Sequence, residues 1–321
     1  MFDFINEHRA QHIAIFSHVR GDGDCLGAQT GLADILQRAG YDVKLYNQEA
    51  LPENFSFLAH YHEIVPFTEE TVLPDLCIAV DCASLERIGN SPDTLHKLTW
   101  INIDHHVSNT SFGALNIVDA EAAATCEILA RMAFAADIVL SKDAATSFYT
   151  GISTDTGSFL YANASAETFA IASRLVQAGA NRTFVRENIF ENTSKKQVEI
   201  YKYLYDHLEF ALDGTMAYCI FSNEQLAALK AVPADLEGVV TMIREIQGVE
   251  LAILFSESIK GICKISMRSR AEFNCNLACG ALGGGGHVRA SGATIEAPLA
   301  EAVDQTLAVV EAQWKEAAYA K

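Results

Sequence analysis

The sequence has no long apolar run and few basic residues. No stretch reaches 18 uninterrupted apolar residues, and the first residues lack a basic segment followed by a long apolar run. We therefore expect neither a membrane span nor a signal peptide, and we expect a cytoplasmic location. Lys and Arg number 23 against 41 Asp and Glu, a formal net charge of −18. Because duplex DNA is bound through cationic surfaces, this charge argues against long duplex DNA as a partner.

Closely spaced cysteine pairs are also missing. The eight cysteines include no Cys-x-x-Cys, and the closest pairs are Cys77 with Cys82 and Cys275 with Cys279. Several cysteines lie in strand-like apolar runs. These features favour reduced, mostly buried thiols over a disulfide framework or a zinc site.

The rest of the composition is that of an ordinary globular protein large enough for two domains. The 321 residues are 50% hydrophobic and 20% charged. A helical pattern without Gly or Pro spans about 194–209, and the alternation of strand and helix patterns restarts after it. We therefore expect a first domain over 1–190, a helical linker over 191–214 and a smaller second domain over 215–321.

Short apolar runs in the first half predict a mainly parallel sheet flanked by helices. Residues 12–17, 76–80 and 100–103 are nearly continuous apolar runs, which suit strands that are covered on both faces. Residues 24–39 have the apolar spacing of a helix, and Gly40 follows its end. An α/β fold is therefore expected.

Metal-binding side chains follow each of these strand-like runs. His18, Asp22 and Asp24 follow the first, Asp81 follows the second, and Asp104-His105-His106 end the third. Asp155 comes after a helical pattern over 143–153. In open α/β sheets, ligands bind at the carboxyl ends of the strands. Asp and His suit Mn²⁺, Mg²⁺ or Zn²⁺, and two cations would balance four carboxylates. We therefore expect these segments to converge on a pair of divalent metal ions.

Each motif taken alone also has a simpler interpretation. Asp-Gly-Asp often forms a plain turn, and His18 alone would more often be an ordinary histidine than a ligand. An EF-hand starting at Asp22 would require an acid or amide where Leu26 stands and Glu where Ala33 stands. A dinucleotide-binding fingerprint starting at Gly21 would require glycine at position 26. The four motifs together favour the metal site.

A glycine-rich stretch in the second half offers a place to bind phosphate. Residues 283–286 are four consecutive glycines followed by His287, and Arg268, Arg270 and Arg289 lie on either side of them. Glycines let a backbone approach a ligand closely, and arginines suit phosphate. No Gly-Lys-Ser/Thr follows, so the stretch is not a Walker P-loop. For the glycines alone, a flexible turn is the simpler interpretation.

Taken together, these motifs resemble the DHH phosphoesterase family, and within its DHH-DHHA1 class the NrnA-like branch. The resemblance covers nearly the whole chain. It implies an N-terminal DHH domain, a smaller C-terminal α/β DHHA1 domain and an active site in the cleft between them. The motifs that carry it are His18 with Asp22 and Asp24, Asp81, Asp104-His105-His106, Asp155 in Gly151–Gly157, and Gly283–His287.

The resemblance also implies roles for individual residues. His18, Asp22 and Asp81 would hold one metal ion, and Asp24, Asp81, His105 and Asp155 the other, with Asp81 shared. Asp104 would orient a histidine, and His106 would lie beside the substrate phosphate. Catalysis would therefore depend on Asp81, Asp104, His105 and His106. The substrate would be bound by His106, Arg268, Ser269, Asn276, Gly284, Gly285, Gly286 and His287.

The first motif departs from the family pattern at two places. The family usually has Pro-Asp-Gly-Asp, whereas Arg20-Gly21 precede Asp22 here, and Gly27-Ala28 stand where Gly-Ser is usual. The ligand residues themselves are intact. We expect the changes to alter loop stiffness and local charge near the phosphate.

The implied activity is hydrolysis of short single-stranded RNA, including linear dinucleotides, and of 3′-phosphoadenosine 5′-phosphate (pAp). A hydroxide that bridges two metal ions would attack the phosphorus, with Mn²⁺ favoured and Mg²⁺ or Co²⁺ as alternatives. A cyclic-dinucleotide phosphodiesterase and a pyrophosphatase or exopolyphosphatase remain as other enzymes. A nucleotide-binding sensor with a decayed site is the non-enzymatic alternative. No membrane partner is expected, and a homo-oligomer is left open.

Overall fold

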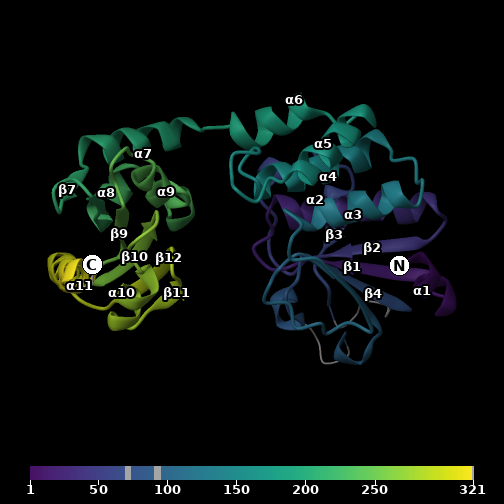
Figure 1. The fold of residues 1–321 in the computed structure, drawn as a ribbon, viewed down its shortest axis with the longest axis horizontal. Coiled ribbons are helices and arrows are strands. Elements are labelled where there is room, and N and C mark those ends of the chain that lie inside the picture. The colour runs from purple at the N-terminus through teal and green to yellow at the C-terminus, as the bar shows by residue number, and fades with distance from the viewer. Residues whose placement is uncertain (69–73, 90–94, 320–321) are drawn as a thin grey trace. The chain divides into compact units, whose positions relative to one another are not determined.

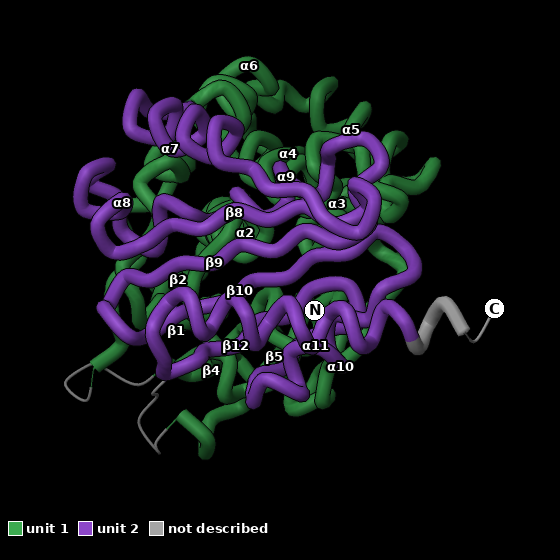
Figure 2. Tube along the Cα trace, turned by 90° about the vertical axis from the view of Figure 1, so that its left-hand side faces the viewer, with its two compact units in different colours: residues 1–192 green, residues 193–321 purple. Residues whose placement is uncertain are grey.

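The chain folds into two compact units in the computed structural model, which describes residues 1–68, 74–89 and 95–319. Unit 1 comprises Met1–Asn192 and unit 2 Thr193–Lys321 (Figures 1 and 2). Each unit has its own six-stranded sheet among the described residues. The expected two-domain α/β fold with a mainly parallel first sheet is confirmed.

Unit 1 alternates strands with helices and short turns of helix. Its strands are β1 (His12–Phe16), β2 (Asp42–Tyr46), β3 (Ile64–Val65), β4 (Leu76–Val80), β5 (Trp100–Asp104) and β6 (Leu115–Val118). Its helices are α1 (Phe2–Glu7), α2 (Gly23–Arg38), α3 (Thr125–Ala135), α4 (Lys142–Asp155), α5 (Ala166–Gln177) and α6 (Arg182–Val185). Shorter helical turns are η1 (Glu53–Phe55), η2 (Tyr61–Glu63), η3 (Leu85–Ile88), η4 (Leu95–Lys97) and the π-type η5 (Arg186–Phe190).

The strand order of unit 1 explains where a ligand can bind. The order is β3-β2-β1-β4-β5-β6, and all described pairs are parallel. The chain progresses to one side of β1 with β2 and β3, and to the other side with β4, β5 and β6. The carboxyl ends of β1 and β4 therefore flank the point where the strand order reverses, which is where open α/β sheets bind ligands.

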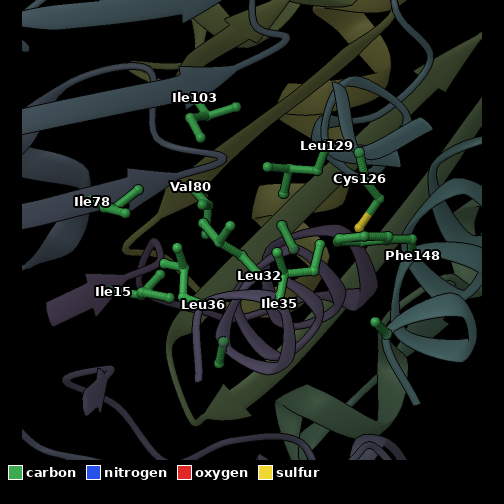
Figure 3. Close-up of a cluster of buried hydrophobic side chains, with 14 of the residues drawn as sticks. Ile15, Leu32, Ile35, Leu36, Ile78, Val80, Ile103, Cys126, Leu129 and Phe148 are labelled. Atoms are coloured by element: carbon green, nitrogen blue, oxygen red, sulfur yellow. The ribbon is translucent and has the colours of Figure 1, made fainter. Parts of the chain in front are cut away.

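Apolar residues on both faces of this sheet are buried. Ile15, Ile78 and Ile103 lie on one face in a buried cluster with Leu32 of α2, and Phe148 of α4 belongs to the same cluster (Figure 3). On the opposite face, the alternate strand residues pack in a second buried cluster. These residues are Ala14, Phe16, Cys77, Ala79 and Trp100. Two buried faces explain why the strands appear in the sequence as continuous apolar runs.

Glycines bring α2 and α4 close together beneath the strand ends. A Cβ atom at Gly27 would lie 2.4 Å from the Ser147 carbonyl oxygen, and one at Gly151 would lie 2.6 Å from Asp24 Oδ1. Both positions therefore require glycine for the two helices to approach. This contact places the first turn of α2 beside the end of α4.

Unit 2 contains a mixed sheet. Its strands are β7 (Glu209–Ala211), β8 (Met216–Phe221), β9 (Leu251–Ile259), β10 (Ile262–Ser269), β11 (Gly285–His287) and β12 (Ala290–Ile295), in the order β11-β12-β10-β9-β8-β7. Only the β8–β9 pair is parallel among the described pairs. Its helical segments are α7 (Lys195–Asp206), α8 (Asn223–Ala228), η6 (Pro233–Leu236), α9 (Val239–Arg244), α10 (Cys275–Ala281) and α11 (Leu299–Tyr319).

The stretch 191–214, expected as a linker, contains elements that belong to unit 2. Ile200 and Leu204 of α7 are buried in a core cluster with residues of β8 and β9. β7 pairs with β8 at the edge of the sheet. The helix packs here because its apolar residues repeat at helical spacing and form one buried face.

All eight cysteines are buried and none forms a disulfide, as the sequence predicts. Within the described residues, no helix is both long enough and apolar enough to cross a membrane.

Candidate metal centre

His18 and Asp81 meet where the strand order of unit 1 reverses. His18 lies two residues beyond β1 and Asp81 directly follows β4. His18 Nε2 lies 3.3 Å from Asp81 Oδ2. His18 Nδ1 donates a hydrogen bond to the Val19 carbonyl oxygen at 2.8 Å, which leaves Nε2 as the atom that faces the carboxylate. Asp81 has a left-handed φ of +58°, which changes the direction of the chain directly after the strand.

Asp22 caps the amino-terminal end of α2 beside His18. Its Oδ1 accepts hydrogen bonds from the backbone N–H groups of Asp24 and Cys25, both at 3.1 Å. Its Oδ2 lies 3.6 Å from His18 Nε2. One carboxylate oxygen is thus used to start the helix and the other faces the histidine.

Asp24 is completely buried and connects α2 to α3. Its Oδ2 accepts a hydrogen bond from Thr125 N at 2.6 Å, and its Oδ1 accepts one from Cys126 N at 2.9 Å. Ala124, the residue before α3, has no side chain that could cap the helix. The Asp24 carboxylate therefore satisfies the free N–H groups at the start of α3.

His105 brings the carboxylates of three different segments together. Its Nε2 lies 3.5 Å from Asp81 Oδ1, 3.4 Å from Asp155 Oδ2 and 3.9 Å from Asp24 Oδ2. Asp155 is the last residue of α4, which continues two residues beyond the helical pattern predicted from the sequence. The carboxylates and His105 come from the ends of four elements, and the geometry brings all of them to one place.

Asp104 and His106 form a hydrogen-bonded pair next to the same carboxylates. His106 Nδ1 donates to Asp104 Oδ1 at 2.7 Å and lies 3.6 Å from Asp81 Oδ1. Asn109 Nδ2 donates to Asp104 Oδ2 at 2.5 Å, so both oxygens of the buried Asp104 have partners. Asp104 thereby fixes the orientation of the His106 ring.

Thr125 is a residue of the site that the sequence motifs did not reveal. Its hydroxyl donates to Asp81 Oδ1 at 3.0 Å, and the residue is fully buried. Asn109, which holds Asp104, was missed as well. Neither residue belongs to a recognisable spacing pattern, although Thr125 at the start of a helix in a small-residue run offers a weak signal.

A buried amide network holds the loop after β1. Asn47 Nδ2 donates to Ser17 Oγ at 2.9 Å and to the His18 carbonyl oxygen at 3.1 Å. Ser17 Oγ donates in turn to Gln29 Oε1 at 3.2 Å. Because buried amides are costly to leave without partners, this network fixes the backbone that carries His18.

Two acids of the centre, Asp24 and Asp155, have pKa values well above the usual range of a carboxyl group. Burial, together with the charges of Asp24 and Asp81, raises the pKa of Asp155 to about 10. Burial and the charge of Asp81 likewise raise the pKa of Asp24 well above its usual value. Burial opposes the charged form of His18, but its hydrogen bonds to Asp22 and Asp81 outweigh that effect and raise its pKa. Divalent cations would offset the repulsion among these closely spaced carboxylates.

The donor set fits divalent metal ions. The residues that could hold an ion fall into three groups whose ligand atoms lie within 4.8 Å of one another: His18 with Asp22 and Cys25, Asp81 with His105 and His106, and Asp24 with His105 and Asp155. Within the described chain, Asp22, Asp24, Asp81 and Asp155 form ion pairs with histidines only. No lysine or arginine there balances their charge, and carboxylate and imidazole ligands suit Mn²⁺ or Zn²⁺.

In unit 2, Arg268 and His287 lie in one cross-strand row. Arg268 of β10 pairs with Ala290 of β12, and Ala290 pairs with His287 of β11. Directly opposite residues on neighbouring strands place their side chains on the same face of a sheet. The small side chain of Ala290 lies between them. Asn276 supports this edge, because its Oδ1 accepts a hydrogen bond from Gly286 N at 2.9 Å.

Other polar residues near the glycines have structural partners. The Ser269 hydroxyl is buried and donates to the Phe273 carbonyl oxygen at 2.7 Å. Arg270 donates to the carbonyl oxygens of Val249, Arg244 and Ile246 at 2.9, 2.9 and 3.3 Å. Arg289 donates to the Phe273 carbonyl oxygen at 3.3 Å. Arg270 therefore holds the chain after α9. Arg268 donates to the carbonyl oxygen of the adjacent Met267 at 2.9 Å and is in none of the ion pairs within the described residues.

A parallel α/β sheet whose strand ends gather four aspartates and two histidines defines a metal-dependent hydrolase. A model of the DHH family, N-terminal domain, matches residues 12–152, and a model of the DHHA1 domain matches residues 220–316. The chain belongs to the DHH family, whose members are metal-dependent phosphoesterases.

Named relatives resemble the chain over most of its length. It is 31% identical over 293 residues to the bifunctional oligoribonuclease and PAP phosphatase NrnA of Mycoplasma pneumoniae, covering 88% of this chain and 87% of that protein. It is 29% identical to the protein of the same name from Thermus thermophilus, covering 96% and 91%. The crystal structure of an exopolyphosphatase-related protein from Bacteroides fragilis superposes with a TM-score of 0.87 at 26% identity, covering 96% and 95%.

Proposed function

We propose that this protein hydrolyses short single-stranded oligoribonucleotides, including linear dinucleotides, and 3′-phosphoadenosine 5′-phosphate. The observation that carries the proposal is the convergence of His18, Asp81 and His105 with three further carboxylates at one edge of the sheet of unit 1. The names of the relatives that cover most of the chain support the two substrate classes.

Two divalent cations are the proposed cofactors, with Mn²⁺ favoured and Mg²⁺ or Co²⁺ as alternatives. His18, Asp22 and Asp81 would hold one ion, and Asp24, Asp81, His105 and Asp155 the other. When bound, the ions balance the four carboxylates, attract the substrate phosphate and lower the pKa of a water molecule enough to make it a nucleophile.

His106 is proposed to contact the substrate phosphate. Its hydrogen bond to Asp104 raises the pKa of the imidazole, which favours the charged ring. With Nδ1 directed at Asp104, Nε2 remains to donate a hydrogen bond to a phosphate oxygen or to the leaving group. Asp104 acts here as a positioning residue.

Unit 2 is proposed to bind the rest of the substrate. Arg268 and His287 share a face of the sheet with only Ala290 between them, which leaves room for an anionic group. Gly284, Gly285 and Gly286 expose backbone along the edge strand, and Asn276 supports that strand. Binding a few phosphates locally would let a chain with a net charge of −18 act on nucleic acid. The Ser269 hydroxyl donates to the Phe273 carbonyl oxygen and its backbone N–H to the Arg289 carbonyl oxygen, so we propose that Ser269 supports the site by holding these segments together and not by contacting the substrate.

A substrate panel tests the proposal. Protein stripped of metal and reloaded with Mn²⁺ is offered di- and triribonucleotides, pAp, a cyclic dinucleotide, pyrophosphate and polyphosphate. We expect turnover of the short RNAs and pAp, and none with Asp81→Asn, which removes a charge shared by both proposed ions. Turnover of polyphosphate alone would instead favour an exopolyphosphatase. The similarity to the exopolyphosphatase-related protein of Bacteroides fragilis supports this second candidate. Nucleotide binding without any turnover would favour a sensor.

A further inference from the structure

We propose that Cys25 is an additional metal ligand beside His18 and Asp22, and that it lets this part of the centre bind thiophilic divalent cations such as Cd²⁺, Co²⁺ and Zn²⁺. The inference rests on the metal centre of the proposed function and adds to it a sulfur donor. It predicts a metal selectivity that oxygen and nitrogen ligands alone would not give.

The three donors are nearly close enough to share an ion. One ligand atom each from His18, Asp22 and Cys25 lies within 4.8 Å of the other two. Ligand atoms on a tetrahedral zinc ion lie about 3.3–3.8 Å apart, so the three donors would need to close by up to about 1 Å. His18 Nε2 and Asp22 Oδ2 are 3.6 Å apart, which is close to the spacing of neighbouring ligands in one coordination shell.

The first turn of α2 directs the thiol toward this place. Cys25 is the third helical residue, and its side chain folds back so that Asp22 N donates to Cys25 Sγ at 3.2 Å. This hydrogen bond favours negative charge on sulfur, but burial opposes it and raises the pKa of the Cys25 thiol, so an incoming cation must displace the thiol proton. Cys25 is fully buried, whereas the Asp22 side chain is 55% exposed, so an ion would enter from the side of Asp22.

Ligation has a defined proton balance. The Cys25 thiol loses its proton to solvent as the sulfur–metal bond forms, and no oxidant or reductant takes part. Thiolate is a soft ligand, which favours Cd²⁺, Zn²⁺ and Co²⁺ over Mn²⁺.

Another buried cysteine provides a matched control. Cys82 directly follows Asp81 and is fully buried, and its thiol donates to the Val80 carbonyl oxygen at 3.3 Å, much as the Cys25 thiol donates to the Asp22 carbonyl oxygen at 3.6 Å. Within the described chain, Cys82 belongs to none of the groups that could hold an ion. Cys82→Ala therefore removes a thiol near the centre without removing a proposed ligand.

The test is a titration of metal-free full-length protein with Co²⁺ and Cd²⁺. Ultraviolet absorbance is recorded at each addition to detect the thiolate-to-metal charge-transfer band. We expect the band in the wild type and in Cys82→Ala, and its loss in Cys25→Ala and Cys25→Ser. Loss of the ligand should weaken Cd²⁺ binding at least about tenfold and change Mn²⁺ binding far less. Because Cys25→Ser nearly keeps the shape of the side chain, loss of the band in this variant cannot be attributed to a folding defect caused by a smaller side chain.

Two results would overturn the role of Cys25 while leaving the metal centre intact. One is stoichiometric Co²⁺ binding, measured by dialysis, without a thiolate band in the wild type. The other is a band that persists in Cys25→Ala. If the wild type binds no divalent ion at all, both this inference and the metal centre of the proposed function fail.

Discussion

Asp24 caps a helix that begins 101 residues later in the chain: its Oδ2 accepts a hydrogen bond from the backbone N–H of Thr125 at 2.6 Å. An acid expected to bind metal thus also starts α3. The same carboxylate has a raised pKa, because it is buried and lies near Asp81. The folding of unit 1 therefore brings the acids together through helix capping before any ion binds.

Asp24→Ala should destabilise the metal-free protein more than Asp155→Ala. Removing Asp24 leaves two buried N–H groups without an acceptor, which costs about 2 kcal/mol or more in the free energy of unfolding. Among the described residues, no backbone N–H donates to the Asp155 carboxylate, so its removal should cost less than about 1 kcal/mol. Urea denaturation in the presence of a chelator measures both, and equal losses would contradict the capping role of Asp24.

Thr125→Val should weaken metal binding without disrupting the fold. Valine has nearly the shape of threonine but cannot donate to Asp81 Oδ1. Groups that orient a ligand commonly contribute about 10–100-fold to metal affinity or activity. We expect a loss of about tenfold in Mn²⁺ affinity by titration calorimetry, and near-normal binding in Thr125→Ser. A Thr125→Val protein with wild-type affinity would assign the hydroxyl a purely structural role.

Metal affinity should rise with pH. The pKa of Asp155 is raised to about 10, so the metal-free protein holds this proton between pH 6 and 8. The pKa of His18 is raised as well by its hydrogen bonds to Asp22 and Asp81, which favours the protonated ring in the metal-free protein. An incoming cation must displace these protons, so each proton released makes the apparent affinity rise up to about tenfold per pH unit.

Calorimetry in buffers of different ionisation enthalpy counts the protons released on Mn²⁺ binding. We expect at least one per protein at pH 7, and a weaker apparent affinity at pH 6 than at pH 8. Asp22 contributes no proton: burial favours its neutral form, but the His18 hydrogen bond outweighs this and lowers its pKa. Affinity that is the same at both pH values would contradict the proposed ligands.

The sequence allowed prediction that these acidic and histidine side chains gather at one edge of the sheet, because several of them follow a recognisable strand. His18, Asp81 and Asp104 come after or at the end of continuous apolar runs, and parallel strands bring such positions to one edge. Thr125 and Asn109 could not be predicted, because their roles depend on which side chains meet across distant segments. Asp155 is the last residue of α4 and does not follow the helix, because α4 continues two residues beyond the helical pattern over 143–153.

The second unit was less predictable from its sequence. The glycines 283–286 alone favoured a turn, whereas Gly285–His287 form the edge strand β11. Strand register depends on pairing partners that no local pattern reveals, so the shared face of Arg268 and His287 became visible only in the fold. Arg270 resembles a phosphate-binding residue in the sequence. Its guanidinium instead holds the chain after α9, through carbonyl oxygens that are distant in the sequence and that no local pattern reveals.

Arg268 and Arg270, two residues apart on the chain, should respond differently to substitution. Arg268→Ala removes a proposed phosphate contact and is expected to raise KM for a dinucleotide about tenfold or more with little change in kcat, since a charge-assisted hydrogen bond contributes about 1.5–3 kcal/mol. His287→Ala should act in the same direction.

Arg270→Ala is the matched control for the same charge. It leaves three carbonyl oxygens without their donor, so it should lower the unfolding midpoint and leave the KM of the folded protein unchanged. Steady-state kinetics and thermal unfolding on the three variants separate the two roles. A raised KM in Arg270→Ala together with an unchanged KM in Arg268→Ala would place the phosphate contact at Arg270, just beyond the end of β10, and the row of Arg268 with His287 would then not bind substrate.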